Sequence, residues 1–343
     1  MRIAVFRALQ LGDLLVAVPA LRSLRAGYPD AEITLISLPW AATFARRFGR
    51  YVDRFVPFPG FPGLAEIRPQ PGGTERFLAE QRAEQYDLVI QMHGNGSVSN
   101  RVVRALAGAR TAGYYEGERP DWLDIAAPYP SGPEVRRNLG LIRLLDCPER
   151  GTDLEFPLTS ADQREAASLL TGLPRPLIGL HPGARSPARR WPAEHFATAA
   201  NLLARRHGGT MVLTGTQEEA SLVDHVARLL EGPAVSLAGR TSLGGLAAVI
   251  VRLDLFLSNS TGPAHIADAV HTPSVIAWGA ADPERWAPLD TTLHRVVRYP
   301  TGCAPCGHWV CPIDHPCLRL LEPAQVAAAA DTILDAGVAV CNA

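Results

Sequence analysis

The chain of 343 residues has 47% hydrophobic residues and a formal net charge of −1 at pH 7, which argues against the basic surface of a nucleic-acid-binding protein. Its length exceeds what one ordinary core holds and predicts two domains. The sequence contains no Lys, so all 33 basic residues are Arg, and both a Walker A phosphate loop and Schiff-base chemistry lose their central residue.

No window offers about 18 uninterrupted apolar residues, so we expect no membrane-spanning helix. The N-terminal stretch MRIAVFRALQLGDLL lacks the charged, apolar and small-residue order of a signal peptide and predicts a first strand instead. The expected location is therefore the cytoplasm.

The first half of the chain alternates short β-rich runs with helical patterns. Strands are predicted at 2–6, 32–37, 53–58 and 87–92, and helices at 19–27 and 74–85. The Pro- and Gly-rich stretch 59–73 predicts a loop, and residues 113–133 predict irregular structure.

The second half repeats the same rhythm more clearly. Strands are predicted at 176–181, 210–215, 234–239, 254–260 and 273–279, and helices at 191–208, 217–232, 242–253 and 322–337. The helix at 191–208 has Pro at its start and Gly at its end, as helix termini favour.

Short apolar runs separated by helices of this length predict parallel sheets with right-handed crossovers. We expect an α/β protein with two doubly wound halves, an N-terminal domain over 1–170 and a C-terminal domain over 171–343, with the linker within 160–175. The last helix, 322–337, could pack on either half. Ligands of such folds bind beyond the carboxyl ends of the strands, so two facing halves would form a ligand cleft.

The first candidate site comes directly after the first predicted strand, in QLGDLLVAVPAL (10–21). Asp13 stands at a strand-to-helix turn, where Asp commonly caps the helix. The alternative is a carboxylate directed into the cleft as a general base. Local sequence favours the cap.

A second candidate, HPGARSPARRWP (181–192), lies after the strand at 176–181. Backbone N–H groups near Gly183, together with Arg185, Arg189 and Arg190, form a predicted anion site ahead of a helix. The alternative is a solvated basic loop.

Two acidic residues, Glu218 and Glu219, lie after the strand at 210–215. Taken alone they are best explained as favourable charges at a helix N-terminus. The alternative is that one accepts hydrogen bonds from ribose hydroxyls. Ser242, at the start of the helix predicted at 242–253, is a further candidate for donor binding.

The stretch SNSTGPAHIA (258–267) continues from a buried strand and leads into a helix. A plain N-cap would need one hydroxyl, whereas this stretch has several polar side chains and a Gly that lets a ligand approach the backbone. We therefore expect it to bind a phosphate or a sugar. The candidates are Asn259, Ser260, Thr261, Gly262 and His265.

Four of the six Cys residues lie close together near the C-terminus: Cys303, Cys306, Cys311 and Cys317. Their spacing, C-x2-C-x4-C-x5-C, is compatible with a structural metal site in which His308 or His315 could replace a thiolate. Reduced structural thiols, or disulfides in an oxidising compartment, are the alternatives.

In their order and spacing, three of these segments together resemble glycosyltransferase family 9, which contains the bacterial ADP-heptose:lipopolysaccharide heptosyltransferases. The first is LGDLLVAVPALRSLRAGYPDAEITL, the second HPGARSPARRWPAEHF, and the third SNSTGPAHIADAVHTPSVIAWGAADPERW. The Cys-rich CAPCGHWVCPIDHPC is also similar to segments of many members. Residues 59–75 and 113–135 are covered least.

The resemblance implies a two-domain GT-B fold and an inverting, metal-independent transfer from a nucleotide-activated heptose. It places the family's general base on Asp13, its phosphate-contacting Lys on Arg189, and its ribose-contacting Glu at or near Glu218. Its Asp-Ser/Thr-Gly motif falls on Ser260, Thr261 and Gly262, so the chain departs from the family at Ser260. No Asp-x-Asp pair occurs anywhere in the sequence, which agrees with a metal-independent reaction.

The resemblance also implies the partners. The donor would be a nucleotide sugar, with ADP-heptose expected, and the acceptor a glycan or lipid-linked molecule, with lipopolysaccharide inner core as the family's main case. A lipid-linked acceptor would bring a peripheral membrane contact at the inner membrane face. The alternatives are another nucleotide sugar, a protein or small-molecule acceptor, and a nucleotide-sugar-binding protein without catalysis. No cofactor is expected to be required for catalysis.

Overall fold

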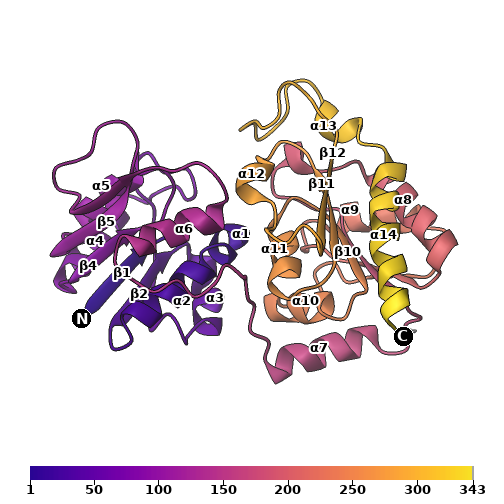
Figure 1. Cartoon of the computed structure of the whole chain (residues 1–343), viewed down its shortest axis with the longest axis horizontal. Coiled ribbons are helices and arrows are strands. Elements are labelled where there is room, and N and C mark those ends of the chain that lie inside the picture. The colour runs from indigo at the N-terminus through magenta and orange to yellow at the C-terminus, as the bar shows by residue number, and fades with distance from the viewer. Residues whose placement is uncertain (342–343) are drawn as a thin grey trace. The chain divides into compact units, whose positions relative to one another are not determined.

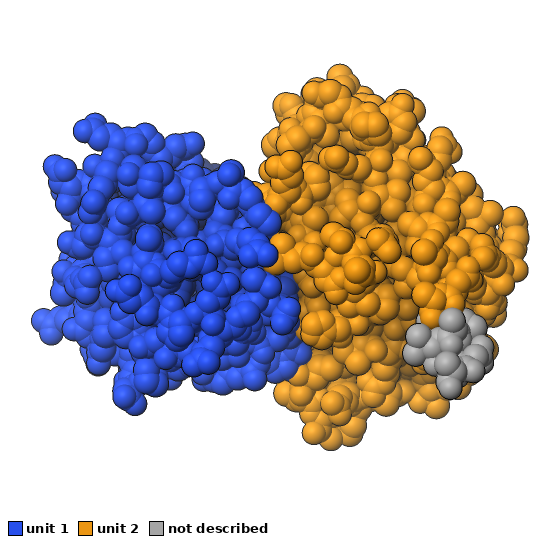
Figure 2. Space-filling model, viewed as in Figure 1, with its two compact units in different colours: residues 1–157 blue, residues 158–343 orange. Residues whose placement is uncertain are grey.

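The computed structural model describes the backbone of residues 1–341 and the side chains of residues 1–336. The chain divides into two compact units, residues 1–157 and residues 158–343, each built on its own six-stranded parallel sheet (Figures 1 and 2). None of the described helices is both long enough and apolar enough to span a bilayer.

The sheet of the first unit has the strand order β3-β2-β1-β4-β5-β6. Its strands are β1 (Arg2–Phe6), β2 (Glu32–Ser37), β3 (Arg54–Pro57), β4 (Leu88–Gln91), β5 (Arg110–Tyr115) and β6 (Ile125–Pro128). Its helices are α1 (Leu11–Leu15), α2 (Val18–Gly27), η1 (Pro39–Ala41), α3 (Ala42–Arg47), α4 (Gly73–Ala83), α5 (Ser99–Ala105) and α6 (Glu134–Arg143).

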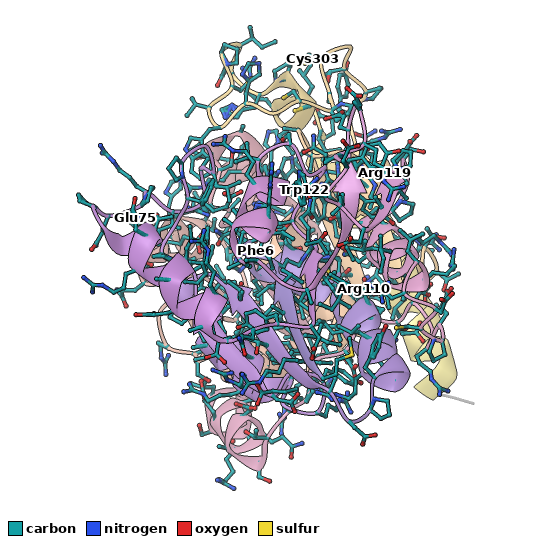
Figure 3. All side chains as sticks on the ribbon, turned by 90° about the vertical axis from the view of Figure 1, so that its left-hand side faces the viewer. Phe6, Glu75, Arg110, Arg119, Trp122 and Cys303 are labelled. Atoms are coloured by element: carbon teal, nitrogen blue, oxygen red, sulfur yellow. The ribbon has the colours of Figure 1, made fainter. Side chains whose placement is uncertain are left out.

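The central strands of this sheet are buried along almost their whole length, because helices cover both faces of a doubly wound sheet. This is why RIAVF and LVIQ are nearly continuous apolar runs. Phe6 illustrates the packing: its ring meets Phe58 edge-on at 4.9 Å and stacks on the imidazole of His93 at 5.1 Å (Figure 3).

The sheet of the second unit has the order β12-β11-β10-β7-β8-β9. Its strands are β7 (Leu177–His181), β8 (Thr210–Leu213), β9 (Ala234–Ser236), β10 (Leu255–Asn259), β11 (Ser274–Trp278) and β12 (His294–Arg298). Its helices are α7 (Ser160–Leu170), η2 (Pro187–Arg189), α8 (Ala193–His207), α9 (Ala220–Arg228), α10 (Leu243–Ile250), α11 (Gly262–Ala269), α12 (Pro283–Trp286), α13 (Pro316–Arg319) and α14 (Pro323–Cys341).

The boundary between the units differs from the predicted 170/171. Residues before 157 belong to the first unit, where Arg22 Nη1 and the Tyr51 hydroxyl donate to the Glu155 carboxylate at 3.1 and 2.6 Å. The predicted linker at 160–175 is largely the helix α7. Its N-cap is Thr159, whose hydroxyl accepts the Asp162 N–H at 3.2 Å.

The last helix packs on the second unit. Val326, Ala330 and Leu334 of α14 are buried in the same cluster as Leu203 of α8, which decides between the two positions expected for this helix (Figure 1).

The stretch expected to be irregular, 113–133, contains the end of β5 and the short edge strand β6. β6 reads IAAP and carries too few β-branched residues for a sequence pattern to mark it. Between these strands, Trp122 receives the Arg104 guanidinium over its ring at 5.5 Å, and Arg119 Nη2 donates to the Leu123 carbonyl at 3.0 Å (Figure 3).

Candidate active site

Both sheets have one topological switch point, where the strand order reverses: between β1 and β4 in the first unit, and between β7 and β10 in the second. In doubly wound sheets ligands bind beyond the carboxyl ends of the strands at this point. Asp13 comes after β1, the loop 182–190 after β7, and the 259–262 turn after β10. The main sequence candidates therefore lie at the switch point of their own unit.

Asp13 lies in the first turn of α1, three residues past its N-cap, which is Gln10. The interpretation of Asp13 as the N-cap itself is therefore wrong in position. Its carboxylate Oδ2 accepts the Gln10 N–H at 3.2 Å, which fixes the start of the helix, and the side chain is partly exposed. This contact and a role as a base are compatible, because a carboxylate has two oxygens and several lone pairs.

A buried Arg is hydrogen-bonded to the backbone of Asp13. Arg7, 1% exposed, donates through Nε to the Asp13 carbonyl at 2.7 Å and through Nη1 to the Met92 carbonyl. Its charge faces the buried Glu134 carboxylate at 3.4 Å, while Asn138 donates to the Val16 carbonyl at 3.1 Å. These groups fix α1 against β4 and α6.

This network gives a stability prediction. Arg7→Met leaves the Glu134 carboxylate buried without its closest cation inside the core, and we expect a loss of about 3 kcal/mol in the free energy of unfolding. The exposed pair Arg205–Glu231, 2.7 Å apart, is the matched control, because Arg205→Met should cost less than about 1 kcal/mol. Urea unfolding measures both. Equal losses in the two variants would show that burial of the Arg7 pair has no energetic consequence.

Two further side chains, those of His93 and Glu66, lie near this end of the first sheet, and the sequence analysis did not identify them. His93, directly past β4, accepts the Ala8 N–H through Nδ1 at 3.2 Å, so its other ring nitrogen carries the proton that faces Glu66 at 3.3 Å. The hydrogen bond to His93 lowers the pKa of Glu66. The position of His93 after a predicted strand was the available signal.

In the second unit, Asn259 joins the two loops of the switch point. Its amide donates to the Pro182 and Gly183 carbonyls at 2.8 and 3.2 Å, and its carbonyl accepts the Trp191 N–H at 2.9 Å. Asn259 is fully buried. Its side chain therefore positions the loop after β7 and is not available for direct contact with a ligand, in contrast to the prediction.

The start of α11 is not capped by a side chain. Thr261 is the N-cap, yet its hydroxyl makes no cap hydrogen bond, and Pro263 stands in the first turn. The alternative of a plain Ser/Thr cap is thus not what the structure has. Gly262 is partly exposed and Ser260 is buried beside it. An uncapped helix N-terminus of this kind attracts an anion.

Arg189 and a neutral His265 lie near the start of α11. Burial, and after it the charge of Arg189, lowers the pKa of His265 to about 4, so the His265 imidazole is neutral at pH 7. Within the residues whose side chains are described, the Arg189 guanidinium, which is exposed, has no ion-pair or hydrogen-bond partner. Arg189 is therefore available for an anion at the start of α11.

The rest of the loop supports this arrangement. Arg185 is exposed and lies over the Trp309 ring at 5.7 Å, whereas Arg190 donates to the Ala184 carbonyl at 2.8 Å and stabilises the loop itself. Gly183 lies against Glu219: an added Cβ would lie 2.2 Å from Glu219 Oε1, so a side chain here would displace the Glu219 carboxylate.

Of the two acidic candidates, Glu219 and not Glu218 is built into the site. Glu218 is exposed, and hydrogen bonds from its own backbone N–H and, after it, the Thr216 hydroxyl lower its pKa. Glu219 packs against Gly183 and accepts the Thr216 N–H at 2.9 Å. The buried His181, 3.0 Å from the Thr214 hydroxyl, lies near it.

Ser242 is a structural cap. Its hydroxyl accepts the Gly245 N–H at 2.9 Å and donates to Glu165 of α7 at 2.7 Å. Both roles of the hydroxyl are occupied within the unit, so the prediction that Ser242 contacts a donor finds no support in the geometry.

The four clustered Cys residues are free thiols at different depths: Cys303 is exposed and Cys317 is buried. Burial, and after it the neighbouring Cys303, raises the pKa of Cys317. Among the described side chains, no group of three or more His, Cys, Asp or Glu is arranged to hold a metal ion, so a metal at Cys303, Cys306, Cys311 and Cys317 is not supported. The free thiols agree with the alternative of reduced structural Cys residues.

Buried neutral His residues make the second unit sensitive to acid. Burial lowers the pKa of His294, which lies 2.8 Å from the Ser274 hydroxyl, to about 4, as it does for His265. An unfolded His titrates near 6.5, so between pH 6.5 and 4 the unfolded chain binds more protons and stability falls as pH falls.

We expect each of these two His residues to cost about 2–3 kcal/mol by pH 4. Urea midpoints measured from pH 7.5 to 4.5 test this, and His294→Gln should flatten the slope by about one proton. An unchanged slope in that variant would contradict the assignment to His294.

Comparison with known proteins gives one consistent result. The model of glycosyltransferase family 9 (heptosyltransferase) matches residues 75–316, well over half of the chain. Lipooligosaccharide heptosyltransferase 2 of Haemophilus influenzae is 26% identical over 317 residues, covering 87% of this chain and 89% of that protein.

Solved structures show the same fold. E. coli ADP-heptose LPS heptosyltransferase II is 22% identical with a TM-score of 0.76, covering 97% of this chain and 98% of that chain. A family 9 glycosyltransferase from Veillonella parvula is 21% identical with a TM-score of 0.80, covering 97% of both chains. The two Rossmann-like units are thus those of a GT-B fold, as predicted. The chain belongs to glycosyltransferase family 9, the heptosyltransferase family, and is a transferase enzyme.

Proposed function

We propose that this protein is an inverting glycosyltransferase that moves a heptose from ADP-heptose to a hydroxyl of an acceptor, most directly the inner core of lipopolysaccharide. The observation that carries the proposal is the uncapped start of α11 beside the neutral His265 and Arg189, whose guanidinium is unpartnered among the described side chains. These groups match the charge of a nucleoside diphosphate. The names of the similar heptosyltransferases supply the sugar and the acceptor.

The reaction is a single displacement. Asp13 takes the proton of the acceptor hydroxyl while its oxygen attacks the anomeric carbon. The new carbon–oxygen bond forms as the bond to the diphosphate breaks, and ADP leaves with the electron pair. Arg189 and the N–H groups at the start of α11 stabilise the growing negative charge, so the displacement requires neither metal nor cofactor.

We assign donor binding and acceptor binding to different units. The second unit binds the donor, with Gly183, Glu219 and Thr261–Gly262 around the nucleotide and diphosphate. The first unit binds the acceptor. A small cavity beside α6 is lined by Gln91, Tyr114, Tyr129, Arg137 and other residues, and the Gln91 Nε2 has no hydrogen-bond partner among the described residues. This cavity could order a water molecule next to the acceptor site.

The donor sugar depends on Ser260, which stands where the family has Asp. A panel of ADP- and UDP-sugars with mass-resolved product detection tests which donor sugar the enzyme uses. Transfer from ADP-heptose and not from UDP-hexoses supports the proposal, and the reverse preference would identify a different sugar.

Acceptor identity is tested in the same assay with deacylated inner core, a protein and small glycosides. The enzyme is proposed to work in the cytoplasm, and a lipid-linked acceptor would bring it to the inner membrane face.

A further inference from the structure

The segment 299–320, between β12 and α14, exposes an unusual concentration of apolar side chains; we call it the Cys-rich segment. Of the ten large hydrophobic side chains that are exposed among the described residues, five belong to it. Trp309, Val310 and Ile313 are 55%, 61% and 60% exposed, more than any of the others. Tyr299 and Leu320 are the other two. The five outside the segment lie apart from one another in the sequence, whereas a cluster of this kind marks an interaction surface.

The segment is an ordered scaffold for these side chains. The Trp309 carbonyl accepts the Ser186 hydroxyl at 2.8 Å and the Ala188 N–H at 3.3 Å, and the Cys306 N–H donates to the Ala280 carbonyl at 2.8 Å. On its inner side, Leu318 is fully buried in the core of the second unit. The apolar residues are therefore held outward while the inner side is anchored. Figure 1 shows the segment at the edge of the unit, where it ends in α13, and Figure 3 labels Cys303 in it.

Formal charge is scarce on this surface, and both signs occur at its border, where Glu322 is exposed just after the segment. Asp314 and Arg319 are the two formally charged residues of the segment, and they pair at 3.2 Å. Arg185, over the Trp309 ring, and the exposed Arg298 border it. Trp and Tyr favour the water–hydrocarbon boundary, and Arg favours anionic headgroups.

We infer that the Cys-rich segment is a membrane contact that inserts Trp309, Val310 and Ile313 into the interface of a bilayer containing anionic lipid. Five partly exposed side chains supply on the order of a few hundred Å² of apolar surface. That is less than the roughly 800 Å² per partner of a stable protein interface, whereas a bilayer needs no complementary groove. The inference gives the proposed peripheral membrane contact a location, and it does not depend on the donor sugar.

Flotation of the full-length protein with vesicles tests the inference. We expect the wild type to partition onto 3:1 phosphatidylcholine:phosphatidylglycerol vesicles and less onto pure phosphatidylcholine. Val310→Ser with Ile313→Ser should reduce partitioning about tenfold or more, because two aliphatic anchors are lost. The matched control is Leu229→Ser with Val251→Ser, which removes side chains that are 39% and 43% exposed elsewhere in the same unit and should change nothing.

Three results would overturn the inference: equal partitioning of the Val310/Ile313 variant and the wild type, an equal loss in the Leu229/Val251 control, or a wild-type dimer that the Val310/Ile313 variant converts to a monomer without any vesicle binding. The last would make the surface an interface between two copies. Trp309 stays in place in all variants because it contacts the loop of Ser186. Transfer to a deacylated, soluble acceptor should remain at the wild-type rate in the Val310/Ile313 variant, so failure of the membrane contact and failure of the proposed reaction are distinguishable.

Discussion

Asp13→Asn is expected to lower kcat by about a hundred- to ten-thousand-fold while donor binding stays within a factor of two. The amide keeps the size of the side chain and its oxygen can still accept the Gln10 N–H, so α1 should keep its start. The variant loses the ability to take a proton from the acceptor hydroxyl. Steady-state transfer and donor titration by calorimetry measure the two effects separately.

Asp30→Asn is the control for this result, because Asp30 is exposed in the loop before β2. It should leave both kcat and donor affinity unchanged. If Asp13→Asn weakens donor binding as much as it lowers kcat, Asp13 is a structural residue and the base lies elsewhere.

Arg189→Ala is expected to have the second largest effect, a loss of about a hundred- to a thousand-fold in kcat with a weaker donor affinity. Only the N–H groups of α11 and Arg185 would then remain to stabilise the growing charge on the leaving diphosphate. Arg189→Lys should recover much of the rate, since a point charge remains, although it lacks the planar fork that grips two phosphate oxygens.

The control for Arg189 is Arg228→Ala, which removes an exposed Arg from the second unit, in the helix α9. It should have no effect on transfer. A full rate in Arg189→Ala would remove Arg189 from the proposed reaction, whereas a loss in donor affinity without any loss in kcat would restrict it to ground-state binding.

Much of the fold could be predicted from local patterns. Strands buried on both faces give continuous apolar runs, and helices with a buried stripe give a 3.6-residue period, so β1, β2, β7, β10 and β11 and the long helix α8 were predictable. The short edge strand β6 was not, because an IAAP run has neither signal. The unit boundary also escaped prediction, since α7 joins the second unit through Glu165, whose partner Ser242 is 77 residues away.

The positions of the candidate residues in the fold were predictable from the order of strands and helices. Parallel strands of a doubly wound sheet end at one edge, so the residues directly after the carboxyl ends of the strands could be assigned to that edge of their own sheet, Asp13 in the first unit and Arg189 and Thr261 in the second. The availability of each side chain for a ligand depends on contacts between distant segments. The Asn259 side chain is hydrogen-bonded to the loop after β7, and the Ser242 hydroxyl to α7, although the sequence gives no sign of either contact.

The same limit explains the residues that were missed. In the sequence, Arg7 is a single polar residue after an apolar strand. Its contacts with the Glu134 carboxylate and the Asp13 carbonyl are formed only in the folded protein. Glu219 and Glu218 are neighbours with equal helix-start signals, and the packing of Glu219 against Gly183 separates them.

The central claim is the transfer of a heptose from ADP-heptose with Asp13 as the base. The most direct measurement is mass-resolved product formation from ADP-heptose and deacylated inner-core acceptor, with wild type and Asp13→Asn side by side. We predict that wild type adds one heptose to the acceptor, and that the variant binds the donor but forms almost no product. Product formation by Asp13→Asn at the wild-type rate would contradict this claim.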